Sequence, residues 1–128
     1  MKQDNSSPSF LVFEQDHFVL SDISELLSDN FADTRVVMLN DLESLSAVLA
    51  TTLGEKAVII SALPEEIVAA SGKLEKSKGD VVAIMITDAS DLALDVNFPC
   101  TVVVRPFSTA MLLDAIKTVI GNLPSFQS

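Results

Sequence analysis

The chain has 128 residues, which is enough to bury one core without a metal ion or disulfides and too few for two domains of ordinary size. Its net charge of -10 repels a nucleic-acid backbone, so we expect no direct nucleic-acid binding. Cys100 is the single cysteine, which excludes an internal disulfide, and the longest apolar run, residues 81–86, is far too short to cross a bilayer, so we expect a cytoplasmic protein without membrane contact.

The predicted elements alternate along the chain between short β-branched runs and longer segments with helical periodicity. We expect strands at residues 10–13, 35–39, 57–61, 81–87 and 101–104. We expect helices at residues 18–30, 41–54, 64–78 and 109–120, with room for only a short one between 88 and 97. Asn40 with Glu43 matches a capping box for the second helix, Pro64 suits the first position of the third, and Ser108 suits the N-cap of the last.

This alternation predicts a (βα)5 domain, an α/β fold of the doubly wound type with helices on both faces of one parallel sheet. Residues 81–87 are apolar until the last position, as expected for a central strand covered on both sides. We expect the folded domain to span residues 10–121, after a flexible polar leader at residues 1–9 and before a C-terminal tail at residues 122–128.

Chemistry in a doubly wound sheet is expected beyond the carboxyl ends of the strands. The polar residues that leave those ends are Glu14 and Gln15 after the first strand, Ser61 after the third, Thr87 and Asp88 after the fourth, and Arg105 after the fifth. Because parallel strands end at the same edge of a sheet, the space between these side chains is the candidate functional site.

Three segments carry a resemblance to a known family. Residues 10–16 (FLVFEQD) look like a first strand ending in acidic magnesium ligands, and residues 82–90 (VAIMITDAS) look like a fourth strand ending in a hydroxyl residue. Residues 102–108 (VVVRPFS) look like a fifth strand followed by Lys-Pro-Phe, with arginine in place of lysine. Over residues 10–121 the chain resembles the CheY-like receiver domains of bacterial response regulators. The resemblance implies a flavodoxin-like sheet with strand order 2-1-3-4-5 and a cis bond between Arg105 and Pro106.

The third strand departs from the receiver pattern. Receivers end this strand in an aspartate about four residues before a proline, whereas VIISALP places Ile60 there, or Ser61 with one gap. Neither side chain can form an acyl phosphate, which requires a carboxylate oxygen. Gln15 also replaces one of the two magnesium-binding carboxylates, and Glu14 alone is a weak metal candidate. We therefore expect no enzymatic activity and no cofactor.

The sequence favours a degenerate pseudo-receiver, a signalling domain that regulates a bacterial protein partner by contact. In this interpretation Arg105 fills the vacated site and pairs with Glu14 or Asp88, and Thr87 is either a vestigial switch hydroxyl or a structural one. One alternative is a phosphorylatable regulator that binds Mg²⁺ and uses a displaced acid, Asp16 or Asp88. Another alternative is a small-ligand sensor with its pocket at the strand ends, although the chain has no glycine-rich phosphate loop.

The partner surface is predicted around the short fourth helix, the fifth strand and the last helix. Residues 91–98 are unusually apolar for a short exposed connection. The predicted interaction face consists of Leu92, Leu94, Phe98, Val102 and Phe107. A homodimer through this face is a further expectation. His17, the only histidine, is expected at the surface near the first helix, and Cys100 is expected to be a small buried apolar side chain.

Overall fold

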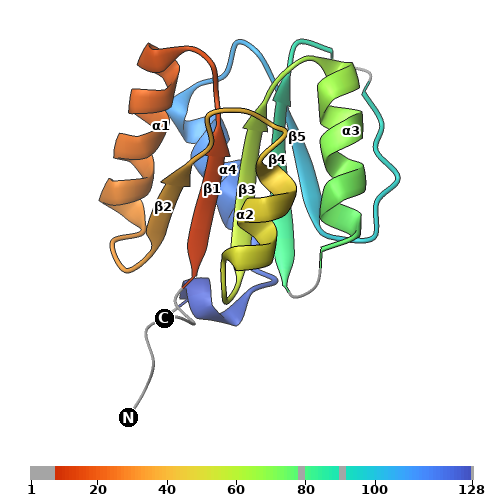
Figure 1. Cartoon of the computed structure of the whole chain (residues 1–128). Helices are drawn as coiled ribbons and strands as arrows, with labels where there is room; N and C mark the ends of the chain where they lie inside the picture. Colours follow the sequence, from red (N-terminus) through yellow and green to blue (C-terminus); the bar gives the residue numbers. More distant parts are fainter. Residues whose placement is uncertain (1–7, 78–79, 90–91, 128) are drawn as a thin grey trace.

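One parallel sheet of five strands, in the order β2-β1-β3-β4-β5, runs through the middle of the molecule (Figure 1). The computed structural model describes residues 8–77, 80–89 and 92–127. The strands are β1 Ser9–Phe13, β2 Arg35–Met38, β3 Lys56–Ser61, β4 Val81–Thr87 and β5 Cys100–Val104. Every neighbouring pair of strands is parallel. The strand order confirms the predicted flavodoxin-like arrangement.

Helices cover both faces of the sheet. They are α1 His17–Asn30, α2 Leu45–Thr51, α3 Pro64–Glu75 and α4 Thr109–Ile120, followed by a short 3-10 helix, η2, at Pro124–Gln127. Buried side chains of α1, α4 and η2 belong to one core cluster, and those of α2 and α3 belong to the other. Within the described residues, none of the helices has both the length and the apolar composition needed to cross a membrane.

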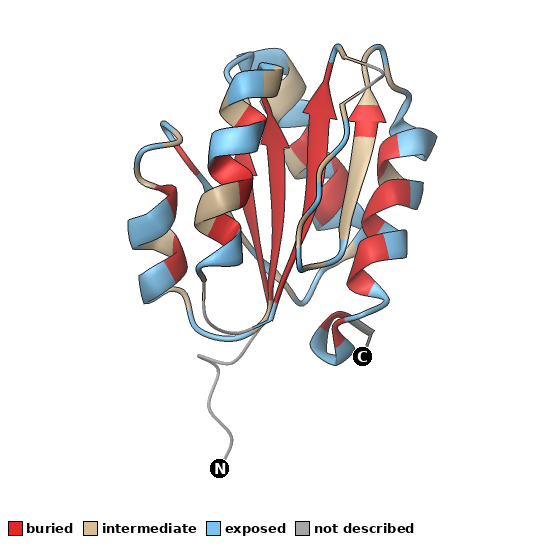
Figure 2. Cartoon of the chain, turned by 90° about the vertical axis from the view of Figure 1, so that its right-hand side faces the viewer, coloured by how far each residue is buried: buried red, intermediate tan, exposed pale blue. Residues whose placement is uncertain are grey.

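The two core clusters lie on opposite faces of the central strands β3 and β4. Along β3, Ala57 and Ile59 face the side of α1 and α4, whereas Val58 and Ile60 face the side of α2 and α3. Every residue of β3 and β4 is buried (Figure 2). Burial on both faces explains why these two strands are nearly continuous runs of Val, Ile and Ala.

The prediction of a short helix between residues 88 and 97 is wrong. Residues 88–89 and 92–99 form an irregular connection without helix. Exposure alternates along this connection, because Leu92, Leu94 and Phe98 are half-buried against the cluster of α2 and α3 while the residues between them include exposed ones. A period of two fits an extended chain and does not fit a helix with 3.6 residues per turn. We call residues 92–98 the strap.

The predicted interaction face is half-buried. Its members in the strap and on β5, namely Leu92, Leu94, Phe98 and Val102, pack against the cluster of α2 and α3. Phe107 packs against the cluster of α1 and α4. The apolar composition of the strap is therefore explained by packing within the domain, and a role of this face in binding a partner stays a prediction.

The start of α2 also differs from the prediction. The helix begins at Leu45, because the side chain of Asp41 accepts a hydrogen bond from the backbone N–H of Ser44 at 2.8 Å and holds a turn at this point. The capping box predicted from Asn40 and Glu43 is wrong. Asp41 competes for the same backbone because aspartate side chains readily form such turns.

The start of α3 at Pro64 is as predicted. The backbone N–H of Leu63 donates a hydrogen bond to Oε1 of Glu66 at 3.0 Å, which satisfies a group at the helix start. The helix ends at Glu75, earlier than the predicted stop at Gly79, which lies outside the described residues.

The packed part of the chain extends beyond both predicted limits. Ser9 belongs to β1 and is buried, and residues 1–7 of the predicted leader lie outside the described residues. Leu123 and Phe126, from the predicted tail, belong to the core cluster of α1 and α4. The ring centroids of Phe126 and Phe10 are 5.1 Å apart. Two large apolar side chains so near the chain end favour packing over exposure.

Candidate functional site

The carboxyl ends of β3, β4 and β5 bring Ser61, Thr87 and Arg105 together. Ser61 and Thr87 are the last residues of β3 and β4, and both are buried. Arg105 directly follows β5, and its backbone N–H donates a hydrogen bond to the carbonyl oxygen of Thr87 at 2.9 Å. The bond between Arg105 and Pro106 is cis, as the resemblance implies. Because these strands are neighbours in the sheet, their last residues meet at one edge.

The side chain of Arg105 joins two of these strand ends. Its Nη2 atom donates a hydrogen bond to Oγ of Ser61, and its Nη1 atom forms an ion pair with Oδ1 of Asp88 at 3.1 Å. The side chain of Arg105 is 31% exposed and that of Asp88 is 73% exposed, so the guanidinium is sheltered near Ser61 and solvated near Asp88. Of the two partners predicted for Arg105, Asp88 is confirmed.

The acidic loop after β1 is held by bonds of its own. Oε2 of Glu14 accepts a hydrogen bond from the backbone N–H of Asp16 at 3.0 Å, and the ion pair described for Arg105 is with Asp88 and not with Glu14. Oδ1 of Asp16 accepts hydrogen bonds from the N–H groups of Phe18 at 2.9 Å and Val19 at 3.3 Å, and thereby caps α1. Gln15 is exposed. These residues lie at the site edge without a bond to its centre among the interactions described.

Ile60 and Ser61 are the two candidates for the position that an aspartate holds in receivers, and their surroundings differ. The side chain of Ile60 is fully buried in the cluster of α2 and α3. The hydroxyl of Ser61 lies at the carboxyl end of β3, in contact with Arg105. Ser61 is therefore the residue at the tip of the central strand, and its hydroxyl cannot form an acyl phosphate.

Receiver domains are found among solved structures of similar shape. A response regulator receiver domain protein (CheY-like) from Methanospirillum hungatei JF-1 matches with a TM-score of 0.59 and 15% identity, over 88% of this chain and 94% of that chain. The N-terminal domain of the nisin resistance regulator NsrR, a lantibiotic response regulator, matches with a TM-score of 0.64 and 16% identity, over 88% of this chain and 97% of that one. The chain has the receiver fold.

Sequence comparison adds nothing to this result. No protein-family model matches the chain, and no curated protein matches it significantly. At identities of 15% and 16%, the likeness between the receiver domains and this chain establishes a shared fold. Activity has to be argued from the residues at the strand ends.

The strand ends of this receiver fold do not fit Mg²⁺, the ion that active receivers hold there. Ser61 supplies a neutral hydroxyl at the strand tip in place of a carboxylate, and this hydroxyl already accepts a hydrogen bond from Arg105. Glu14 already accepts a backbone hydrogen bond, and Gln15 supplies no charge. In the part of the chain that the structure describes, no group of three or more His, Cys, Asp or Glu residues could hold a metal ion.

The surroundings of Thr87, His17 and Cys100 fit structural roles. The hydroxyl of Thr87 accepts a hydrogen bond from the N–H of Ala89 at 3.4 Å, so it helps to shape the loop after β4. His17 is exposed at the start of α1, as predicted. Cys100 packs against the cluster of α2 and α3, and burial raises the pKa of its thiol to about 11. Cys100 is half-buried, so it packs as an apolar side chain but is less buried than predicted.

A groove of about 500 Å³ lies beside the ion pair of this receiver-fold site. Its lining combines Asp88, Arg105 and Phe107 with residues from α1 and the start of α4. The other lining residues are Val19, Asp22, Ile23, Leu26, Pro106, Thr109 and Leu112. This groove could not be predicted from the sequence, because it depends on how α1 packs beside a segment near the other end of the chain.

Proposed function

We propose that this chain is a pseudo-receiver, a receiver-fold domain of bacterial two-component signalling that regulates a protein partner and does not accept a phosphoryl group. The contact between Arg105 and Ser61 carries the proposal, because a guanidinium is bonded to a hydroxyl at the strand tip where receivers have their aspartate. On this proposal the domain has no catalytic activity of its own.

The bonds of Arg105 suggest how such a domain works. A receiver that accepts phosphate shifts between two conformations, and its ligand must favour one of them. Here Arg105 already links Ser61 to Asp88 through a hydrogen bond and an ion pair. The domain would therefore present one fixed surface to its partner, and the partner's own concentration would control the complex.

The groove beside the ion pair is the surface that we propose for the partner. It is lined largely by apolar side chains and includes Phe107, a member of the predicted interaction face. A partner in this groove would touch Asp88 and Arg105 and so contact the site directly. Homodimerisation stays a separate prediction, and light scattering over a range of concentrations would show whether the mass rises above the 13.7 kDa of one chain.

Incubation of the full chain with acetyl phosphate and Mg²⁺, followed by intact-mass spectrometry, tests the proposal. We expect no phosphoryl adduct, while an active receiver domain treated in the same way gains one. Beryllofluoride with Mg²⁺ is expected to leave the amide NMR signals of Ser61, Thr87 and Asp88 in place. A phosphoryl adduct on any acidic side chain would overturn the proposal.

The rival function is phosphorylation of a displaced acid, and the two candidate acceptors, Asp16 and Asp88, both already form bonds in the structure. Asp16 caps α1, and Asp88 pairs with Arg105, so each would have to give up these bonds to reach a phosphoryl donor. The variants Asp16→Asn and Asp88→Asn keep the size of each side chain and remove the carboxylate. If the chain gains a phosphoryl group and one variant does not, that residue is the acceptor and the rival function is correct.

A further inference from the structure

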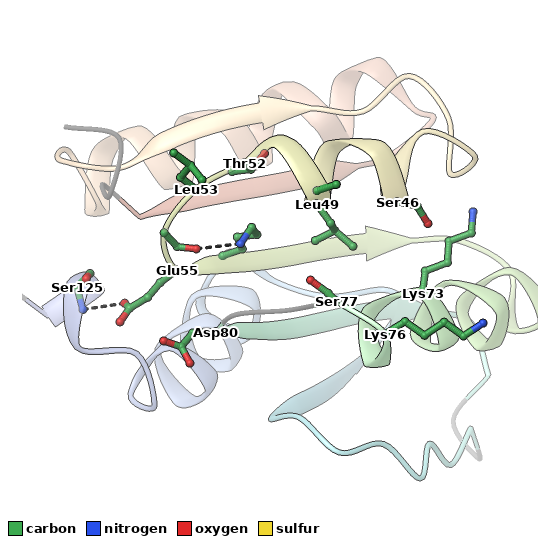
Figure 3. A pocket seen from close by; sticks show the side chains of 13 residues that line it. Ser46, Leu49, Thr52, Leu53, Glu55, Lys73, Lys76, Ser77, Asp80 and Ser125 are labelled. Carbon is green, nitrogen blue, oxygen red and sulfur yellow. Dashed lines mark hydrogen bonds between the residues drawn. The ribbon is translucent and has the colours of Figure 1, made fainter. Parts of the chain in front are cut away.

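A larger pocket lies at the opposite end of the strands from Ser61, between α2 and the end of α3 (Figure 3). Its volume is about 780 Å³, which is within the usual range of small-molecule sites. The pocket lies at the amino ends of β3 and β4, where Lys56 and Asp80 contribute to its lining. The length of β3, about 17 Å for its six residues, separates this pocket from Ser61.

Lys56 is a buried amine in the lining of this pocket. It is only 3% exposed, and its place in β3 puts it on the same face as Val58 and Ile60. Among the described residues its Nζ atom donates one hydrogen bond, to the carbonyl oxygen of Gly54 at 2.9 Å, and an ammonium has three donors. Burial lowers the pKa of Lys56, although the charge of Asp80 opposes this shift. Burying a charged group with few partners costs free energy, so this amine is an unusual choice for a buried strand position.

A second buried polar group lies next to Lys56. Ser9 on β1 is the register partner of Lys56, and its position places it on the same face of the sheet as Leu11. Ser9 is 1% exposed, and its hydroxyl has no hydrogen-bond partner among the residues that the structure describes. Within residues 8–77, 80–89 and 92–127, this end of the sheet therefore holds two buried polar side chains with unused bonding capacity.

The charges around the pocket favour an anion. Three of the eight basic residues of the chain contribute to its lining, Lys56, Lys73 and Lys76, although the chain as a whole carries a net charge of -10. Nζ of Lys73 donates a hydrogen bond to the carbonyl oxygen of Leu42 at 2.9 Å, and the amines of Lys73 and Lys76 point away from the cavity (Figure 3), so Lys56 is the amine placed to meet a ligand. Two carboxylates, Glu55 and Asp80, are also present. They disfavour a dianion such as a phosphate monoester, and the lining contains no arginine that could bind a phosphate bidentately. A single negative charge fits this balance best.

The wall formed by α2 and the residues after it contains apolar side chains beside the hydroxyls of Ser46 and Thr52. Leu49 and Ala50 lie on α2, and Leu53 follows it (Figure 3). Leu53 is 55% exposed, so it offers apolar surface that a ligand could cover. Across the pocket, the carboxylate of Glu55 accepts a hydrogen bond from the N–H of Ser125 at 2.7 Å, so this carboxylate already has a partner.

We propose that this pocket binds a small organic monocarboxylate with an apolar body. The carboxylate accepts hydrogen bonds from Nζ of Lys56, and the apolar body covers Leu49 and Leu53. The site lies at the opposite end of β3 from Ser61, so it is independent of the proposed signalling role.

Titration of the full chain with hexanoate, followed by amide NMR, tests this inference. We expect saturable shifts at Thr52, Leu53 and Gly54 and none at Thr87. 1-Hexanol has the same chain without the charge, and inorganic phosphate has the charge without the chain. Both are expected to bind at least about tenfold more weakly than hexanoate, a difference of roughly 1.4 kcal/mol. Absence of saturable shifts with hexanoate, or equal binding of either control compound, overturns the inference.

Variants assign the binding to the named side chains. Lys56→Met keeps most of the stem and removes the amine, and we expect it to weaken hexanoate binding at least about tenfold. Lys117→Met is the matched control, because Lys117 is exposed and lies on α4, the helix that covers the other face of the sheet. If Lys56→Met fails to fold, Leu53→Asp serves instead, since Leu53 is largely exposed. Unchanged binding in the variant tested would overturn the assignment.

Discussion

Arg105 donates a hydrogen bond through Nη2 to the hydroxyl of Ser61, a residue 44 positions earlier in the chain. β4 lies between the strands that carry these residues, so the arginine side chain reaches past the end of β4. The guanidinium places a positive charge at the tip of β3, where an active receiver needs a carboxylate and a metal ion. The contact therefore links the ends of β3 and β5 across β4.

The variant Arg105→Met is expected to lower the free energy of unfolding by about 1–3 kcal/mol, because the buried hydroxyl of Ser61 loses its partner. The double variant with Ser61→Ala should lose less than the sum of the two single variants, since both remove the same bond. Urea unfolding of all four proteins measures this coupling.

The control for this cycle is Asp88→Asn. The side chain of Asp88 is largely exposed, so its ion pair with Arg105 is expected to contribute less than about 1 kcal/mol. A coupling energy near zero between Arg105 and Ser61 would mean that their contact does not stabilise the fold.

The sheet and most helices could be predicted because each depends on a local pattern. β3 and β4 are continuous apolar runs, and Ser108 and Pro64 mark helix starts. The site could be predicted only in part. Arg105 was expected to bind Glu14 or Asp88, and the choice depends on loop geometry that the sequence does not encode locally. The strap was mistaken for a helix because a few apolar residues over so short a stretch fit both periods.

The pocket around Lys56 was not predicted, although one signal was present in the sequence. Lys56 lies two residues before Val58 and four before Ile60. Because side chains alternate along a strand, it points to the same buried face as these two. The remaining walls come from α2, α3 and η2, and their approach is a tertiary feature.

The strap offers a test of its packing. Leu94→Asp is expected to lower the free energy of unfolding by about 1–2 kcal/mol, because this half-buried side chain covers the cluster of α2 and α3. Ala93→Asp, one residue earlier and exposed, should change it by less than about 0.5 kcal/mol. Urea midpoints of the two variants give the comparison. Equal midpoints would show that the strap is not packed as described.

The thiol of Cys100 is expected to be unreactive in the native protein. Burial raises its pKa from 9.0 to about 11, so little thiolate exists at pH 8 and a thiol reagent should react slowly until urea unfolds the chain. The unfolded state releases this proton first, so the thiol's contribution to stability is complete below pH 9 and declines as the pH rises towards 11. Cys100→Ala should remove that part of the decline. Rapid labelling of the folded chain at pH 8 would contradict this expectation.

Lys56 should show the opposite dependence on pH. Its pKa in the folded state lies below the ordinary value of 10.5, so the unfolded state binds more protons in the range between the two values. Stability is therefore reduced at neutral pH and rises with pH through this range, until both states are deprotonated.

Lys56→Met should be at least as stable as the parent chain at pH 7, because it removes a charge that is costly to bury. The difference between the two proteins should shrink as the pH approaches 10.5. Urea unfolding at several pH values measures it, and because both proteins share every other titrating group, their difference isolates Lys56. A clear loss of stability in Lys56→Met at pH 7 would identify the amine as part of the fold's support, and the position would then need no ligand to explain it.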